Sequence, residues 1–241
     1  MRSASDQRSA PNLSQLRRER EREAMRVRIL AAARELFAER GVDAVTMRAI
    51  AERIEYSATA IYFHFRDKEA LLRALLTDDF RLFAAELQKV TTISDPVVRL
   101  RASAKAFVEF GLTHPNHYRL MFMTPLSEDP VLAAGPALDR HSPAEDAYTF
   151  LQTMVREAAD AGAIKAEFKD LELVCQVLLS GFHGIVSLQI AHNPGGQNQH
   201  GRIHWRSPSK LRDVMCDCLL AGLVTSSAIS RVQKKSRKKG S

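Results

Sequence analysis

The stretch ILAAARELFAERGVDAVTMRAIAERIEYSATAIYFHFRDKEALL, residues 29–72, decides the fold of this chain. In its first part apolar residues recur every three or four positions, which is the period of a helix, and Gly41 follows as a terminator. Two shorter apolar patterns come next, and residues that can cap a helix, Thr46 and Ser57, precede them. Asp67 can cap a longer helix after them. The stretch therefore predicts two short helices joined by a tight turn and braced by longer helices, which is a helix-turn-helix unit.

The rest of the chain repeats the helical period at greater length. Helix starts are expected at Asp95-Pro96, at Pro115 and at the capping box Ser142-Pro143-Ala144-Glu145. An uncharged helix is expected from about residue 170 to 192, and a final helix from about 209 to 226. No segment alternates convincingly between apolar and polar residues, so the sequence predicts an all-α fold.

Positive charge is concentrated at the two ends of the chain. The first 28 residues contain eight arginines against four acids, and residues 229–241 contain six basic residues and no acid. Basic ends are typical of arms that contact phosphate or an acidic membrane surface, but a solvated disordered tail without a partner has the same composition.

Composition and motifs exclude several classes of protein. Cys175, Cys216 and Cys218 are too few and too close together for a disulfide framework. The charged N-terminus lacks the apolar stretch of a signal peptide, so a cytoplasmic location is expected. No nucleophile elbow, phosphate-cradling loop or metalloprotease motif occurs, so we expect neither an enzyme nor a cofactor. His192, His200 and His204 lie in one polar segment, but we predict no metal site there.

The uncharged helix raises a membrane alternative. No Asp, Glu, Lys or Arg occurs from residue 173 to 201, and this stretch is long enough to cross a bilayer. Polar side chains are spread through it, which would be costly in lipid. A helix buried within protein is therefore expected, with no membrane partner. The remaining alternative from another class is a membrane-surface or scaffold protein that uses its basic termini and this apolar helix.

Residues 29–72 resemble the DNA-binding domain of the tetracycline-repressor-like (TetR) family of bacterial transcriptional regulators. The resemblance rests on a first helix that ends in Phe-x-x-x-Gly, on Thr46, on Ile50-Ala51, and above all on Ile61-Tyr62-x-x-Phe65-x-x-Lys68-Glu69-x-Leu71. Two later segments, THPNHYRLMF and SGFHGIVSLQ, are similar to the ligand-binding half of one branch of the family.

The resemblance implies a homodimeric, ligand-responsive repressor that binds a palindromic operator in double-stranded DNA. It implies a helix-turn-helix DNA-binding domain (23–70) and a ligand-binding and dimerisation domain (71–228). The charge distribution adds a basic, flexible arm (1–22) and a basic disordered tail (229–241).

A small, mostly apolar effector is expected, because the candidate pocket residues are mainly rings and thioethers. These candidates are Phe107, Phe110, Tyr118, Met121, Phe122, Met154 and His183. The dimer is expected to form through the last two helices, since a helix that is apolar all round has one face for its own core and another for a partner. The residues expected at that interface are Val186, Ile190, Val214, Cys218 and Gly222.

The residues expected to contact DNA lie on the second short helix and at the starts of the helices beside it. They are Thr46, Arg48, Ser57, Thr59, Ala60, Tyr62, His64 and Lys68. Thr59 and Ala60 are small, so that the backbone can approach base edges. Tyr62 follows one turn later, with its hydroxyl placed to reach phosphate. Lys68 would clamp a phosphate, since the first turn of its helix adds partial positive charge.

Each of these assignments has a plain structural alternative. Thr46 and Ser57 can serve only as helix caps, Tyr62 can be a packed ring with a wet tip, and Lys68 can be a solvated lysine. Ile61 and Phe65 are expected in the core, and we expect Phe63 to pack against a flanking helix.

The turn between the short helices departs from the family pattern. The family usually has Ala-Gly-Val there, whereas this chain has Ile54-Glu55-Tyr56. Glutamate in a left-handed conformation costs about 1 kcal/mol more than glycine, so the sequence predicts a strained or rebuilt turn with Tyr56 exposed.

The arm before the first helix has two readings. Its four arginines, Arg17, Arg18, Arg20 and Arg22, would suit a neighbouring minor groove. The interleaved glutamates equally favour a solvated helical extension.

Overall fold

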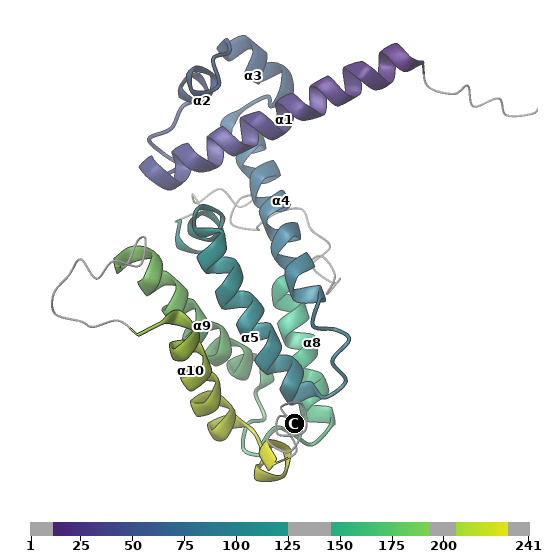
Figure 1. Ribbon diagram of the computed structural model, residues 1–241, viewed down its shortest axis with the longest axis vertical. Helices are drawn as coiled ribbons and strands as arrows, with labels where there is room; N and C mark the ends of the chain where they lie inside the picture. The colour runs from purple at the N-terminus through teal and green to yellow at the C-terminus, as the bar shows by residue number, and fades with distance from the viewer. Residues whose placement is uncertain (1–11, 125–145, 193–205, 231–241) are drawn as a thin grey trace, which may run out of the picture. The chain divides into compact units, whose positions relative to one another are not determined.

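A computed structural model describes residues 12–124, 146–192 and 206–230. Within these ranges the chain is all-α, as the sequence predicts (Figure 1). The helical segments are α1 (Leu13–Arg40), α2 (Met47–Arg53), α3 (Ala58–His64), α4 (Lys68–Gln88), α5 (Pro96–Thr113), α6 (Pro115–Tyr118), the π-helix η1 (Arg119–Met123), α8 (Ala147–Asp160), α9 (Leu171–His192) and α10 (Pro208–Leu223). The only β pairing in these ranges is an isolated antiparallel bridge between Ile164 and Val224.

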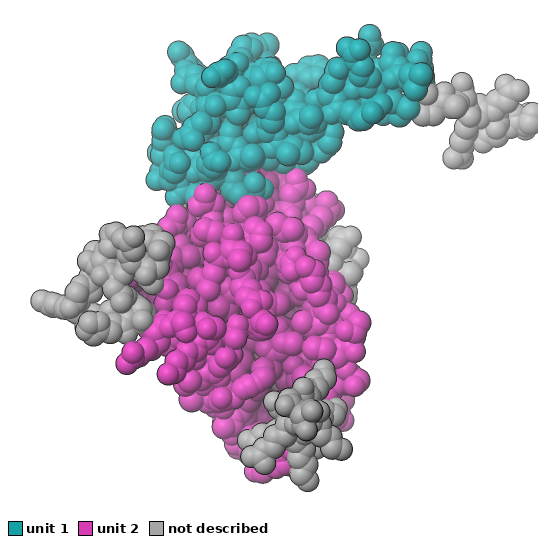
Figure 2. All heavy atoms as spheres, in the orientation of Figure 1, with its two compact units in different colours: residues 1–72 teal, residues 73–241 magenta. Residues whose placement is uncertain are grey.

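The described residues form two compact units, which divide between Leu72 and Arg73 (Figure 2). The division falls inside α4 and close to the predicted boundary after residue 70. The basic tail predicted over residues 229–241 lies outside the described residues except for Ile229 and Ser230.

In the first unit, α1, α2 and α3 enclose a small core. The inner face of α1 buries Ile29, Ala33, Leu36 and Phe37. From the short helices, Ile50 and Ile61 are both fully buried. Both short helices are capped as predicted: Thr46 Oγ1 accepts from Ala49 N at 3.1 Å, and Ser57 Oγ accepts from Ala60 N at 3.3 Å. Local caps thus fix both helix starts, and apolar burial fixes which faces turn inward.

In the second unit, α5 is the central helix and contacts α6, α8, α9 and α10. Asp95 caps α5 as predicted, with Oδ1 accepting from Val97 N at 3.1 Å and Pro96 at the first helical position. The predicted capping box at 142–145 lies outside the described residues. Helix α8 begins at Ala147, where Asp146 Oδ1 accepts from Tyr148 N at 2.9 Å.

Helix α9 is, among the described helices, the one long and apolar enough to cross a membrane. It packs against α5, α8 and α10 inside the second unit. Its buried residues include Val174, Leu178, Phe182 and Val186. The core of a protein therefore accounts for its apolar character.

Candidate functional site

The outer face of α3 presents small and aromatic side chains to solvent. Ile61 and Phe65, which are 0% and 6% exposed, anchor the helix in the core, in agreement with the sequence prediction. Thr59 is exposed and Ala60 half-buried. Tyr62, one turn after Thr59, is 52% exposed, so its hydroxyl is available to a partner. The face that a groove of DNA would meet therefore carries little bulk near its start and a phenol beyond it.

Phe63 differs from the expectation that it packs against a flanking helix. The guanidinium carbon of Arg22, on α1, lies 5.8 Å from the ring centroid, and the Phe63 side chain stays 74% exposed. His64 lies edge-on to this ring. Partial burial, and then the positive charge of Arg22, lower the pKa of His64 below its ordinary value. In the protein without DNA, both effects favour the neutral form of this imidazole.

The ammonium of Lys68 is partly used in hydrogen bonds within the protein and keeps one donor free. Its Nζ donates to the carbonyl oxygens of Val42 at 3.1 Å and Val45 at 3.2 Å. An ammonium has three donors, so these two bonds leave one for an anion. Lys68 thus ties the start of α4 to the loop before α2 and can still meet a phosphate. The two carbonyl bonds were not foreseeable from the sequence, since they join residues 26 and 23 positions apart.

Thr46 and Arg48 lie at the start of α2. The Thr46 hydroxyl is used as a cap, and the side chain is exposed. Arg48 Nε donates to Glu52 Oε1 at 2.9 Å, and its side chain is 83% exposed. Such a surface pair contributes at most about 1 kcal/mol, so Arg48 can exchange Glu52 for another anion at little cost.

The turn between α2 and α3 carries the strain that its sequence predicts. Glu55 has a φ of 61°, in the left-handed region. Tyr56 N donates to Ala51 O at 2.9 Å, which closes the end of α2. Tyr56 is 42% exposed, with the guanidinium of Arg28 5.3 Å from its ring centroid. Other contacts of the unit hold the glutamate in a conformation that suits glycine.

The second unit contains a cavity of about 110 Å³ with an apolar wall. Its wall includes Phe80 and Phe83 of α4, and Leu100 and Ala104 of α5. Three of the predicted pocket residues line it, namely Phe107, Phe122 and Met154. The other four, Phe110, Tyr118, Met121 and His183, do not. The polar residues on its wall are Ser103, Asp146 and Tyr148.

Tyr118 and His183 are paired with each other beside that cavity. The Tyr118 hydroxyl lies 2.7 Å from His183 Nδ1, and the two rings are stacked. Tyr118 is 0% exposed, and burial raises its pKa far above the ordinary value, so the hydroxyl keeps its proton; which of the two groups donates depends on the tautomer of His183. Burial lowers the pKa of His183, so its imidazole is neutral. The two polar groups thus satisfy each other's hydrogen-bonding capacity within an apolar core.

Two family profiles match the chain over these two regions. The family described as "Bacterial regulatory proteins, tetR family" matches residues 29–75, and the "Tetracyclin repressor-like, C-terminal domain" matches residues 100–203. The chain belongs to the TetR family of transcriptional regulators. Regulators of this family bind DNA through the helix-turn-helix, carry an effector-binding C-terminal domain and are not enzymes.

Known TetR-family proteins are similar to parts of the chain. The transcriptional activator FasR of Mycolicibacterium smegmatis is 35% identical over 114 residues, which cover 47% of this chain and 52% of FasR. The transcriptional regulator UidR of Escherichia coli is 44% identical over 54 residues, 22% of this chain and 28% of UidR. The chain thus spans about half the length of FasR and less of UidR.

Among solved structures, SmeT, the repressor of the Stenotrophomonas maltophilia multidrug efflux pump SmeDEF, superposes with a TM-score of 0.60 at 23% identity, covering 84% of this chain and 92% of SmeT. The chain therefore shares the fold of SmeT over most of its length.

The residues expected at the dimer interface divide between two environments. Val186 and Ile190 of α9 are 0% and 6% exposed, because they face the core of their own chain. Val214, Cys218 and Gly222 lie on the outer face of α10, where Val214 is 53% exposed. On α9 the exposed apolar residues are Leu173, Val177 and Leu188, which sequence reasoning missed. An all-round apolar helix does not reveal from its sequence which face meets the core.

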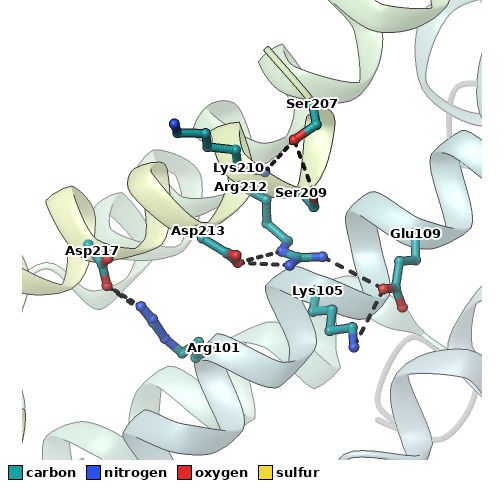
Figure 3. Close-up of polar contacts among 9 residues, drawn as sticks. All are labelled: Arg101, Lys105, Glu109, Ser207, Ser209, Lys210, Arg212, Asp213 and Asp217. Carbon is teal, nitrogen blue, oxygen red and sulfur yellow. Dashed lines mark hydrogen bonds and ion pairs between the residues drawn. The ribbon is translucent and has the colours of Figure 1, made fainter. Parts of the chain in front are cut away.

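Ion pairs hold the opposite face of α10 to α5 (Figure 3). Arg212 lies between Glu109, at 3.6 Å, and Asp213, at 2.8 Å, and its side chain is only 12% exposed. Arg101 pairs with Asp217. These contacts fix the rotation of α10 about its axis, and so the face that it turns outward. A partly buried arginine with two carboxylates is more constrained than a solvated pair.

No group of three or more His, Cys, Asp or Glu that could hold a metal occurs in the described ranges. His200 and His204 lie outside those ranges.

Proposed function

We propose that this TetR-family regulator is a homodimeric repressor that binds a palindromic operator and is released by a small, mostly apolar molecule. The observation that carries the proposal is the position of the cavity along helix α4. Phe80 and Phe83 of that helix line the cavity wall, and the same helix begins at Lys68. An effector that presses on the two rings therefore acts on the helix that follows the recognition helix.

The operator contacts are proposed for the exposed face of α3 and the helix starts around it. Thr59 and Ala60 read base edges, while Tyr62 and Lys68 contact phosphates. Ser57, Thr46, Arg48 and His64 complete the set. Because Lys68 also holds the loop before α2, it positions that loop as well as binding DNA.

The dimer is proposed to form through the outer faces of α9 and α10. Leu173, Val177 and Leu188 of α9 are exposed apolar side chains. Gly222 of α10 has no atom within 4 Å of a Cβ built on it, so a partner helix can approach closely there. Two helices from each subunit would form a four-helix bundle, and the dimer would hold two recognition helices about 34 Å apart, as one turn of B-DNA requires. Cys218 and Val214 contribute to this surface, whereas Val186 and Ile190 support it from inside.

The effector is proposed to occupy the cavity of the second unit. Rings and aliphatic side chains form most of the wall, so an apolar body is favoured, and Ser103 or Asp146 would orient one polar group. Tyr118 and His183 are already bonded to each other and support the wall from behind. Operator binding would repress transcription in the cytoplasm, and release of the operator on effector binding would relieve that repression.

The experiment starts with selection of bound sequences from random duplexes, followed by footprinting and a screen for small molecules that release the complex. A short symmetric footprint is expected. A membrane-surface or scaffold protein would protect no site, and that result would overturn the proposal.

A matched pair of variants then tests the effector site. Ala104→Met places a longer side chain into the cavity, and Ala102→Met places the same side chain at a half-buried position of α5 that lines a separate hollow. We expect Ala104→Met to keep operator affinity and dimer mass while losing release, and Ala102→Met to behave as wild type. If the effector released both variants from the operator equally well, its binding site would lie outside this cavity.

Lys68→Ala tests the DNA assignment. Removing one phosphate-binding ammonium from each subunit should flatten the slope of log K against log salt by about 0.9 per subunit, on operator and random DNA alike. A lower melting temperature with an unchanged slope would leave Lys68 with only its loop-holding role.

A further inference from the structure

Helix α1 extends by several turns beyond the residues that pack against α2 and α3. The arginines on these N-terminal turns follow a regular spacing. The helix begins at Leu13, where Asn12 and Gln15 form a capping box, so the arginines that precede Ile29 are helical rather than a loose arm. Figure 1 shows α1 continuing past α3 toward its N-terminus. The face that buries Ile29 and Ala33 is extended in that direction, at helical spacing, by Arg26, Arg22 and Arg18.

Two cation–π contacts fix the direction in which this arginine stripe points. The guanidinium carbon of Arg22 lies 5.8 Å from the ring centroid of Phe63, and that of Arg26 lies 5.9 Å from the ring centroid of Phe65. Both rings belong to the recognition helix or its C-terminal end. The stripe therefore lies on the side of α1 that faces α3, beside the surface proposed to enter the groove.

The other arginines of the extension have different surroundings. Arg17 Nε donates to Glu21 Oε1 at 2.8 Å, and Arg20 Nε donates to Leu16 O at 3.2 Å. Arg26 pairs with Glu23 at 3.5 Å and is only 33% exposed. Arg18 and Arg22 are exposed and form no ion pair with a carboxylate in the described part of the chain. Their charge is thus open to an external anion on the face next to α3.

We propose that Arg18 and Arg22 form a second DNA-contacting element, which binds the sugar-phosphate backbone beyond the bases read by α3. The partner is argued from charge complementarity and from continuity with the recognition surface. One helical turn separates the two arginines by about 6 Å along the axis. That distance is close to twice the rise of about 3.4 Å per phosphate of one strand along the duplex axis, so the two guanidiniums can reach different phosphates. The exposed Phe63 ring supports the Arg22 guanidinium, which explains why a large apolar side chain stays at the surface.

This inference rests on the proposed use of α3 in the major groove. Two measurements distinguish the contact made by Arg18 and Arg22 from the contact made by α3. The first compares Arg18→Ala/Arg22→Ala with the matched control Arg17→Ala/Arg20→Ala, which removes the same charge from other faces of the helix. Alanine favours the helix, so neither change should unfold the extension. For the first variant we expect the slope of log K against log salt to flatten by about 0.9 for each phosphate that an arginine no longer neutralises. The control should retain nearly the wild-type slope.

The second readout is the length of the duplex. Trimming the DNA that flanks the selected operator should weaken wild-type binding and bring it to the level of the Arg18→Ala/Arg22→Ala variant, which should be insensitive to trimming. Equal sensitivity of wild type and variant, or equal slopes for the variant and its control, would overturn the second element. Failure of the α3 assignment would appear separately, as an unchanged sequence preference in Thr59→Ala.

Discussion

The hydrogen bond between Tyr118 and His183 can be tested directly. The sequence predicts that both residues contact the effector, whereas the structure gives them a role in stability. Tyr118→Phe removes one oxygen and keeps the ring, which packs against Phe107 and Phe122 at centroid distances of 5.8 and 4.8 Å. The change therefore isolates the bond of 2.7 Å to Nδ1 of His183. We expect folding stability to fall while effector release is unchanged, since neither residue lines the cavity.

The magnitude follows from what each change leaves behind. Without the hydroxyl, Nδ1 of His183 loses its hydrogen-bond partner in a half-buried position, which costs about 1 to 2 kcal/mol. His183→Leu leaves the phenol of a fully buried Tyr118 without a partner, at a cost of about 1 to 3 kcal/mol. The double variant removes both groups, so its loss should be smaller than the sum of the single losses by about 0.5 to 1.5 kcal/mol.

The assay is urea unfolding of the four proteins at one fixed concentration, because a dimer's apparent stability depends on concentration. In a parallel thermal scan, each kcal/mol should lower the melting temperature by about 2 to 4 °C in a chain of this size. Operator release is measured on the same preparations. Strictly additive losses, or a raised effector requirement in Tyr118→Phe at wild-type stability, would refute the structural role and return the pair to the pocket.

Three further predictions test other parts of the chain. Glu55→Gly should raise the free energy of unfolding by about 0.5 to 1 kcal/mol, because it relieves a positive φ, and chemical denaturation would detect a loss instead if the turn is unstrained. Gly111→Ala should destabilise the protein by about 1 to 3 kcal/mol, because its Cβ would lie 2.4 Å from a methyl of the buried Val186, and an unchanged melting temperature would contradict this packing. Since burial lowers the folded-state pKa of His183, its contribution to stability is complete above the unfolded value of about 6.5 and declines as pH falls below it. Denaturation between pH 5 and 8 should show this decline in wild type and less of it in His183→Leu.

Much of the first unit was predictable because its signals are local. Thr46 and Ser57 cap helices that start within three residues of them, and the spacing of Ile61 and Phe65 states which face of α3 is buried. The strained turn was predictable for the same reason, since glutamate stands at a position that suits glycine. Lys68 was only half predictable: its place at the start of α4 is local, but its carbonyl partners are set by tertiary structure.

The second unit was less predictable because its decisive contacts join distant residues. Tyr118 and His183 are 65 positions apart, and residue type alone could not distinguish a pair that bonds internally from two groups that await a ligand. Phe107 and Met154 line the cavity, whereas Phe110, of the same type and on the same helix as Phe107, packs between Phe83 and His114. Helical periodicity separates inside from outside, but it does not separate a cavity wall from the rest of a core.

The contacts of α4 favour a direct coupling between effector binding and DNA binding, in which this one helix would transmit the change. The helix covers 21 residues without interruption, and its first residue holds the loop before α2 through two carbonyl bonds. In the proposed switch, an effector would displace Phe80 and Phe83, and α4 would transmit that displacement to Lys68. It would then strain the two bonds that hold the loop before α2, and it would shift the one ammonium donor left for phosphate. Two carbonyl bonds cost only a few kcal/mol to strain, which is within the coupling energy that effectors typically supply. In this proposal the same lysine links DNA binding to effector binding, because the cavity rings and Lys68 belong to one helix.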